Sequence, residues 1–181
     1  MDDQERLRWI EAVLAKYEGP LIRYATHLTG RAEMARDVVQ DTFFKLCEAD
    51  PAAVAEHVGA WLYRVCRNRV IDLTRKDKAM RPLDDAKLAA TASADPPPAA
   101  SLESAQSGAL VIRLLARLPE RQQEVVRLKF QEGLSYREIA SVTGQSVTNV
   151  GFLLHGALRK LRELWAEVER GGTPAPARSM P

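Results

Sequence analysis

The chain has 181 residues, a formal net charge of +2 and two cysteines. This length allows one domain or two small ones, and the near-zero charge does not by itself indicate a nucleic-acid partner. No apolar run approaches the roughly 20 residues that span a bilayer, and the charged N-terminus lacks the apolar segment of a signal peptide. We therefore expect a cytoplasmic protein without direct membrane insertion. Cys47 and Cys66 lack metal-site spacing and the three histidines are scattered, so we expect buried free thiols, no metal and no cofactor.

The first thirty residues predict two helices that build a core. The apolar residues of Glu5–Tyr17 recur on one helical face: Leu7, Ile10, Val13, Leu14 and Tyr17. Gly19-Pro20 is expected to end this helix, because proline disrupts helix interiors. A second helix is then expected from Leu21 to Leu28, ending at Thr29-Gly30.

The next helix, Arg31–Glu48, has two distinct faces. The residues expected to be buried follow helical spacing: Ala35, Val38, Val39, Thr42, Phe43 and Leu46. The opposite face gathers two carboxylates, an amide and an aromatic ring: Asp37, Gln40, Asp41 and Phe44. Charges on such a face often mean only that it is solvated. An aromatic ring among them also suggests a contact surface for another protein.

Asp50-Pro51 breaks that helix, and a loop is expected to about Glu56. A long helix follows, Val58–Lys76, whose buried side is marked by Val58, Leu62, Val65, Val70 and Leu73. Its outer face is basic, with Trp61 near its start and with Arg64, Arg67, Asn68, Ile71 and Arg75 along it. Such a face suits a phosphate backbone and unstacked bases, although a merely solvated basic face is equally consistent with the pattern.

A change of composition divides the chain into two helical domains. The segment 82–107 is rich in Pro and Ala and reads as a flexible linker. The expected domains are therefore 1–81 and 108–170, followed by a disordered tail, 171–181. The second core begins with Leu110, Val111, Leu114, Leu115 and Leu118. Pro119 then suits the first turn of a helix that runs to Gln131 and is ended by Gly133.

The stretch from Gly133 to Leu164 predicts a helix-turn-helix. Ser135 and Glu138 have the spacing of a capping box, and Gly144 allows the left-handed backbone of a tight turn. Ser146 is expected to cap the second helix. The expected buried stripe of that helix is Val147, Val150, Leu154, Ala157, Leu158, Leu161, Leu164 and Trp165.

The other face of the second helix fits a DNA major groove. It carries polar, basic and aromatic side chains: Thr148, Asn149, Phe152, His155 and Arg159. The alternative is a plain helical corner, because all-α proteins that never bind DNA also contain helix–glycine–helix turns.

Three motifs, in order, resemble the bacterial RNA polymerase sigma factors of the sigma-70 family, in the extracytoplasmic-function (ECF) group. DVVQDTFFKL from Asp37 resembles the polymerase-binding helix of region 2. WLYRVCRNRVIDLTRK from Trp61 resembles the helix that melts the promoter and reads its −10 element. Leu118 to Glu163 resembles region 4, which reads the −35 element. The resemblance implies an all-α fold of two small helical domains joined by a flexible linker.

The resemblance also implies partners and roles. Core RNA polymerase would be bound by Asp37, Gln40, Asp41 and Phe44. The −10 element and opened strand would be held by Trp61, Arg64, Arg67, Asn68, Arg69 and Arg75, with a flipped base received by the loop from Asp50 to Val58. The −35 element would be contacted by Tyr136, Arg137, Ser146, Thr148, Asn149, Phe152, His155 and Arg159. An anti-sigma factor is a further expected partner; enzymatic activity and a small-molecule substrate are not expected.

One departure from the family concerns the recognition helix. Gly151, Leu153 and Gly156 stand where family members often carry Lys or Arg. Fewer cations imply weaker electrostatic attraction to DNA, so this helix would depend more on shape and apolar contacts, or else face a protein. The alternative function is a helix-turn-helix regulator or protein-interaction module that acts without polymerase.

Overall fold

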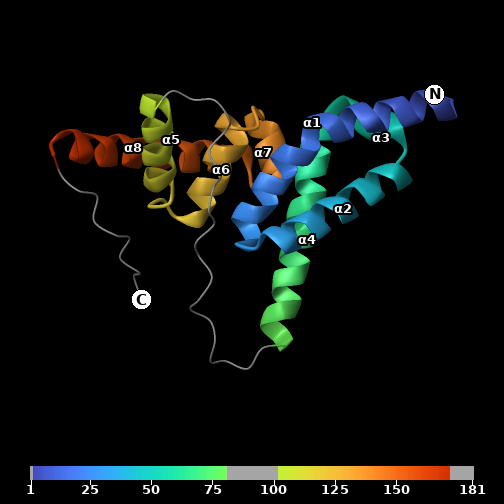
Figure 1. Ribbon diagram of the computed structural model, residues 1–181, viewed down its shortest axis with the longest axis horizontal. Coiled ribbons are helices and arrows are strands. Elements are labelled where there is room, and N and C mark those ends of the chain that lie inside the picture. The colour runs from blue at the N-terminus through green and yellow to red at the C-terminus, as the bar shows by residue number, and fades with distance from the viewer. Residues whose placement is uncertain (1, 81–101, 172–181) are drawn as a thin grey trace. The chain divides into compact units, whose positions relative to one another are not determined.

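The computed structural model describes residues 2–80 and 102–171, and every regular element in these ranges is helical (Figure 1). The elements in chain order are α1 (Asp3–Thr29), α2 (Ala32–Glu48), α3 (Pro51–Val54), the 3-10 turn η1 (Ala55–His57), α4 (Val58–Met80), α5 (Leu102–Leu115), α6 (Glu120–Phe130), α7 (Tyr136–Thr143) and α8 (Val147–Glu169). The expected all-α fold is confirmed for these residues.

The helices form two compact units, one built mainly from α1 to α4 and the other from α5 to α8. Most of the predicted linker, and the predicted tail from residue 172, lie outside the described residues. Helix α5 nevertheless begins at Leu102, inside the range predicted for the linker. Leu102, Glu103 and Ala105 are good helix formers, so the helix can begin here. The predicted linker included them because they follow a run of prolines. The remaining domain boundaries stay predictions.

Helix α1 is continuous, so the predicted break at Gly19-Pro20 is wrong. Proline has no amide hydrogen, and its ring crowds the carbonyl one turn earlier, which normally ends or kinks a helix. Gly19 reduces the strain because it has no Cβ to collide with the proline ring. Beyond the proline, Leu21, Tyr24 and Ala25 are buried, so packing supports the second half of the helix.

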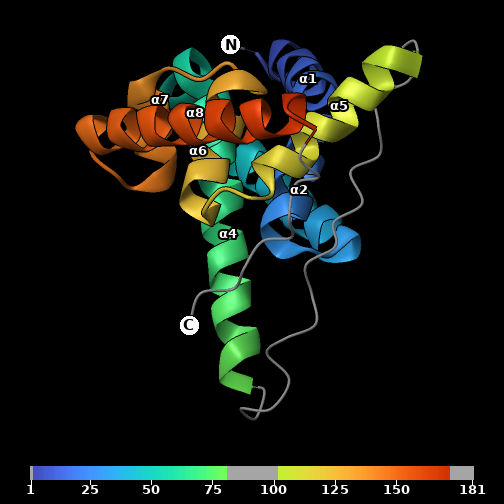
Figure 2. The same cartoon turned by 90° about the vertical axis from the view of Figure 1, so that its left-hand side faces the viewer.

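The core of the first unit lies between α1, α2 and α4. The predicted buried stripe of α2, from Ala35 to Leu46, is confirmed at every position. Tyr24 of α1 and Tyr63 of α4 meet edge to face, with their ring centroids 5.2 Å apart. Aromatic pairs in this geometry contribute beyond the area they bury. The C-terminal half of α4 extends past α1 and α2 (Figure 2).

Both cysteines are free, as expected, but only Cys66 is buried, and Cys47 is exposed. Burial raises the pKa of the Cys66 thiol from 9.0 to about 12, while a hydrogen bond with Thr42 lowers it to a smaller extent. The folded pKa therefore lies above the unfolded one. The associated stability is fully present below pH 9 and is lost as the pH rises toward 12.

In the second unit, α6 and α5 pack against α8. Val150, Leu154, Ala157 and Leu164 of the predicted stripe are buried. Leu158 and Leu161 are half-buried. The stripe is wrong at its ends, since Val147 and Trp165 are exposed. The Trp165 indole donates to Glu169 Oε1 over 2.9 Å, so its polar edge has a partner at the surface. Val111 of α5, also expected in this core, is exposed as well.

A glycine at the start of α4 permits a close contact that leads to a prediction. A Cβ at Gly59 would lie 2.9 Å from the Tyr17 hydroxyl and 3.3 Å from two ring carbons. A Cβ added at Gly108 of α5 would meet no atom within 4 Å. Both alanine variants gain helix propensity, but only Gly59→Ala must displace a ring, at a typical overpacking cost of about 1–3 kcal/mol. We expect Gly59→Ala to be less stable than Gly108→Ala by about that difference in urea unfolding. Equal stabilities would show that Tyr17 yields without cost.

Candidate protein and nucleic-acid interfaces

The outward face of α2 is held rigidly, because its opposite face is buried along the whole helix. Asp37, Gln40 and Phe44 are exposed, and Asp41 is half-buried. The Phe44 ring is 60% exposed, so a large apolar group stands in water among polar neighbours. A rigid helix with such an arrangement is suited to contact a protein, since exposed aromatic residues often anchor interfaces.

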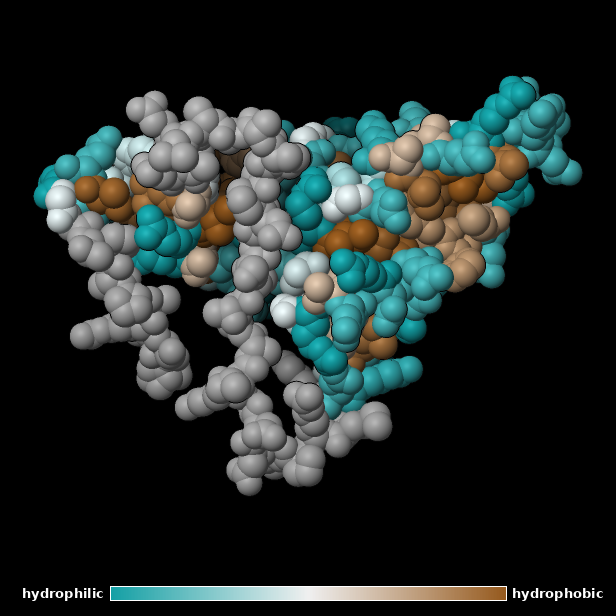
Figure 3. Space-filling view, viewed as in Figure 1, coloured by the Kyte–Doolittle hydropathy of each residue, from teal (hydrophilic) through white to brown (hydrophobic). Residues whose placement is uncertain are grey.

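Apolar surface near this face continues onto α1. Figure 3 shows apolar side chains gathered over α1 and the C-terminal half of α2. Leu7 and Leu14 of α1 are 57% and 39% exposed, which corrects their expected burial. Arg6 joins the two helices, because its guanidinium donates to the carbonyl oxygens of Cys47 (2.5 Å) and Ala49 (3.2 Å). Helical spacing placed Leu7 and Leu14 on the apolar face of the helix, but it could not show that no other helix covers them.

An ion pair joins α2 to α4. Arg69 Nε lies 2.8 Å from Asp41 Oδ2, and both side chains are partly exposed. The sequence placed Asp41 in a protein-binding set and Arg69 in a DNA-binding set. The structure pairs these two side chains with each other, so each partly neutralises the other's charge. No sequence signal identified this contact, because the two residues lie 28 positions apart.

The remaining predicted residues of α4 lie along a basic outer face. Arg64, Asn68 and Arg75 are exposed, while Trp61 and Arg67 are half-buried. Arg75 lies 3.6 Å from Asp72, one turn earlier. Ile71, which is 43% exposed, adds an apolar group to the same face. Cations interleaved with apolar and aromatic side chains match the chemistry of single-stranded nucleic acid.

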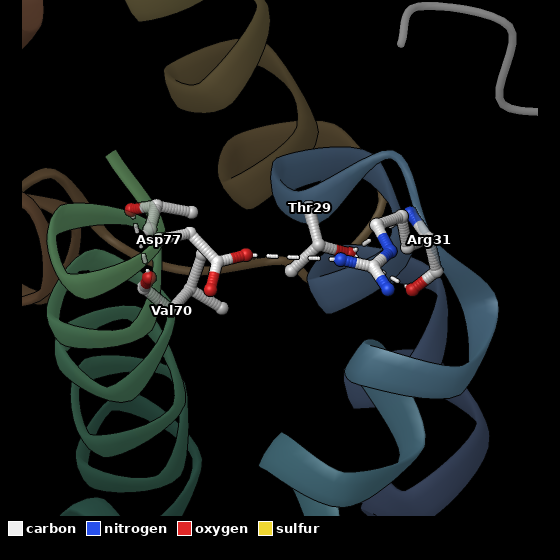
Figure 4. Close-up of polar contacts among 5 residues, drawn as sticks. Thr29, Arg31, Val70 and Asp77 are labelled. Carbon is white, nitrogen blue, oxygen red and sulfur yellow. Dashed lines mark hydrogen bonds and ion pairs between the residues drawn. The ribbon is translucent and has the colours of Figure 1, made fainter. Parts of the chain in front are cut away.

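A second long-range ion pair supports the C-terminal part of α4. In Figure 4, Arg31 points from the turn between α1 and α2 toward Asp77, with Arg31 Nη1 3.7 Å from Asp77 Oδ2. The Thr29 hydroxyl can donate to the carbonyl of Ala25 (2.9 Å) or of Arg31 (3.0 Å), and its oxygen accepts from the Arg31 amide (3.2 Å), which fixes the turn. Sequence reasoning missed this pair. It connects the exposed turn between α1 and α2 to the C-terminal part of α4.

The segment before α4 is not the simple loop that the sequence predicted. Asp50 caps α3 by accepting from the Ala52 amide over 3.0 Å, and Pro51 occupies the first helical position. Val54 is buried, and η1 then leads directly into α4. The segment predicted to receive a flipped base is therefore an anchored helical turn, in which Ala55, Glu56 and His57 are exposed.

The helix-turn-helix is confirmed in detail. Ser135 Oγ accepts from the Glu138 amide, and a Glu138 carboxylate oxygen accepts from the Ser135 amide over 2.8 Å. Gly144 ends α7 with φ 69°, a conformation that glycine adopts without strain. Ser146 caps α8 by accepting from the Asn149 amide over 3.1 Å.

The predicted DNA-facing residues of the second unit are all exposed: Tyr136, Arg137, Ser146, Thr148, Asn149, Phe152, His155 and Arg159. The Phe152 ring is 76% exposed. The exposed N-terminal turns of α8 thus present hydroxyl, amide and aromatic groups on one face. A helix presenting such groups can read base edges in a major groove.

The two unexpected glycines of α8 face neighbouring side chains of the same unit. A Cβ at Gly151 would lie 3.7 Å from the Tyr136 ring, and one at Gly156 would lie 3.3 Å from Gln122 Nε2. Lys129 also lies over the Tyr136 ring, with its Nζ 5.6 Å from the ring centroid. Both glycines are half-buried; a Cβ at Gly151 would make an ordinary contact with the Tyr136 ring, and one at Gly156 would require a small shift of the Gln122 amide.

Within residues 2–80 and 102–171 no group of His, Cys, Asp or Glu side chains is placed to hold a metal ion. None of the described helices is both long and apolar enough to span a membrane.

Comparison with known proteins gives two family matches in the order of the two units. Residues 13–80 match Sigma-70 region 2, and residues 109–161 match Sigma-70, region 4. The ECF RNA polymerase sigma factor RpoE of Cereibacter sphaeroides is 31% identical over 148 residues, covering 82% of this chain and 79% of that protein. SigL of Mycobacterium tuberculosis, also an ECF sigma factor, is 30% identical over 156 residues, covering 84% and 86%.

Two solved structures are similar to the chain. The sigma factor RpoE of Bartonella quintana, in complex with the anti-sigma factor NepR, gives a TM-score of 0.65 at 23% identity. The alignment covers 86% of this chain and 96% of that one, and at this identity it supports the fold. CnrH, in complex with the cytosolic domain of CnrY, gives a TM-score of 0.57 at 26% identity and covers 88% and 89%.

The pair between Asp41 and Arg69 leads to a second prediction. Partly exposed ion pairs typically contribute about 0.2–1 kcal/mol. We expect a double-mutant cycle of Asp41→Ala and Arg69→Ala, measured by urea unfolding, to give a coupling energy in that range that falls with added salt. The control cycle uses Asp72 and Arg75, whose longer, more exposed pair should couple more weakly. A coupling no larger than the control's would mean that the pair does not hold α2 to α4.

Proposed function

The chain belongs to the ECF group of the sigma-70 family, and from this premise we propose which of its surfaces carry out each step of transcription initiation. Like other members, it is a sigma factor: it binds core RNA polymerase, directs promoter-specific initiation and catalyses no covalent reaction itself. The carrying observation is that matches to both promoter-reading regions occur in one chain, in the same order as the two helical units.

We assign polymerase binding to the outward face of α2, formed by Asp37, Gln40, Asp41 and Phe44. The exposed Phe44 ring supports this assignment, because an apolar group in water gains free energy when a partner covers it. Asp37 would add specificity by pairing with a cation of the partner, and Asp41 would do so by sharing or leaving its pair with Arg69. The family resemblance implies that this partner surface is the coiled coil of clamp helices in the largest polymerase subunit.

We assign the opened −10 strand to the basic face of α4, from Trp61 to Arg75. Arg64, Asn68 and Arg75 are exposed, so they can approach phosphates without repacking the core. Arg67 and Trp61 are half-buried at its edge. Arg69 differs from them, because its Nε faces Asp41. Arg69 would contact DNA through its Nη groups while keeping the bond to Asp41, or it would break that bond and turn toward the DNA.

We assign the −35 element to the second unit. Arg137 and Tyr136 begin α7, where phosphates would be met, together with Arg159 farther along α8. Ser146, Thr148, Asn149, Phe152 and His155 lie where base edges would be read. Asn149 is suited to adenine and Phe152 to a thymine methyl group.

An anti-sigma factor and a cytoplasmic location complete the proposal. RpoE of Bartonella quintana and CnrH are similar in fold, and they were solved in complex with the anti-sigma factor NepR and with the cytosolic domain of CnrY, respectively. We infer that this chain also binds an anti-sigma protein. Its place is the cytoplasm, because core polymerase and promoter DNA are found there.

The first functional prediction concerns α2. Asp37→Arg reverses a charge at the N-terminal end of the assigned surface, and opposed like charges cost several kcal/mol. We expect Asp37→Arg to reduce co-precipitation with core polymerase by on the order of tenfold or more, and Gln40→Ala to reduce it less. Run-off transcription from a cognate promoter should fall in parallel. The control is Arg8→Glu, an equal charge reversal on the exposed surface of α1. Undiminished binding by Asp37→Arg would remove α2 from the interface.

The second functional prediction concerns Arg137. Each phosphate neutralised by a cation releases counterions, which makes binding weaken as salt is added. Loss of one such cation therefore makes the negative slope of log K against log salt shallower by about 1. We expect this change for Arg137→Ala when the full chain binds a duplex containing its −35 element, followed by fluorescence anisotropy. The control is Arg113→Ala, an exposed arginine of α5 outside the assigned surface. An unchanged slope for Arg137→Ala would exclude a phosphate contact at the start of α7.

A further inference from the structure

Gln145, in the turn between α7 and α8, holds the side chain of Asn149. The Asn149 Nδ2 donates to Gln145 Oε1 over 2.7 Å. The Gln145 backbone amide donates to the Ala140 carbonyl over 3.1 Å, and the Asn149 amide donates to Ser146 Oγ over 3.1 Å. Both ends of the amide-to-amide bond are therefore anchored through their backbones to the helix-turn-helix itself.

This bond determines what Asn149 can offer to a partner. A carboxamide has one acceptor oxygen and two amide hydrogens. Gln145 accepts one hydrogen, so Asn149 Oδ1 and the other Nδ2 hydrogen take no part in this bond. The major-groove edge of adenine presents an N6 donor next to an N7 acceptor, and these match the two free groups of Asn149.

The orientation of the amide matters because its two ends are chemically opposite. The last torsion of an asparagine side chain has a broad, roughly two-fold preference, so a free amide exchanges the positions of its oxygen and nitrogen. Binding a base then requires this rotation to be frozen, which costs affinity. The bond to Gln145 freezes it before DNA arrives and selects one of the two orientations.

We propose that Gln145 is a positioning residue that sets the Asn149 amide to read adenine in the major groove at the −35 element. The inference rests on the proposed function, in which the first turns of α8 enter that groove. Gln145 is not among the residues assigned above to the −35 element. The inference gives it the role of orienting Asn149 and requires an adenine opposite that side chain.

The test uses the full chain bound to core RNA polymerase and a pool of promoter duplexes randomised across the upstream element. Bound DNA is sequenced, and the preference for each base is measured at each position. The variants are Gln145→Ala, Gln145→Glu, Asn149→Ala and the double alanine variant. The control is Gln131→Ala, an exposed glutamine at the end of α6. A thermal melt of each variant confirms that it folds.

The proposal expects adenine to be preferred at one base pair and this preference to depend on both residues. Asn149→Ala should lower it by roughly 5- to 150-fold, the range for losing a bidentate contact. Gln145→Ala should lower it by roughly two- to tenfold, the range for freeing one ordered side chain. In the Asn149→Ala background, Gln145→Ala should cause no further loss at that position.

Gln145→Glu separates positioning from a merely structural role. Glutamate keeps the oxygen that accepts from Asn149, so the adenine preference should survive although its charge weakens binding to every sequence alike. An unchanged preference in Gln145→Ala would overturn the proposal, as would an unchanged profile in Asn149→Ala. In either case selection elsewhere in the element would leave the proposed function standing. If the wild-type complex selects no upstream sequence, the proposed reading of the −35 element fails, and this inference fails with it.

Discussion

The burial of a single stripe on each long helix is the constraint on which the candidate interfaces depend. An α-helix has about 3.6 residues per turn, so fixing which residues face the core also fixes which residues face away from it. Burial of Val38, Val39 and Thr42 turns Asp37, Gln40 and Phe44 outward on α2. Burial of Val150 and Leu154 likewise leaves Asn149 and Phe152 exposed on α8. The chemistry of each surface follows from the packing behind it.

Contacts between distant residues then refine these surfaces. Asp41 and Arg69 lie at the edges of two candidate interfaces and are paired with each other. A partner that binds either residue therefore meets a charge that is already partly compensated. The glycines of α8 show a related effect, since Gly151 and Gly156 lie against Tyr136 and Gln122. The first turns of α8, residues 147–156, hold no Lys or Arg, so the proposed specificity there depends more on amide and aromatic groups.

A sigma factor of this kind acts by binding, so small free energies decide its behaviour. Each proposed surface offers few strong contacts: one exposed aromatic ring on α2, several cations on α4 and an ordered amide on α8. Because the two units belong to one chain, engagement of one raises the effective concentration of the other at the same promoter. Modest individual contacts can therefore give a specific complex, and changes of about 1.4 kcal/mol alter its population tenfold.

The sequence by itself determined the helices whose signals are local. Ser135, Glu138 and Gly144 specify α7 and its turn through hydrogen bonds and backbone conformation within a few residues, and the buried stripe of α2 follows from spacing alone. Only the tertiary structure decided the rest. The continuity of α1 through Pro20 depends on packing beyond the proline, and the exposure of Leu7 and Leu14 depends on which helix covers them. The pairing of Asp41 with Arg69, and of Arg31 with Asp77, joins residues far apart along the chain. Periodicity reports which side of a helix is apolar, but the neighbour that covers it is set by the packing of whole helices, which no local pattern contains.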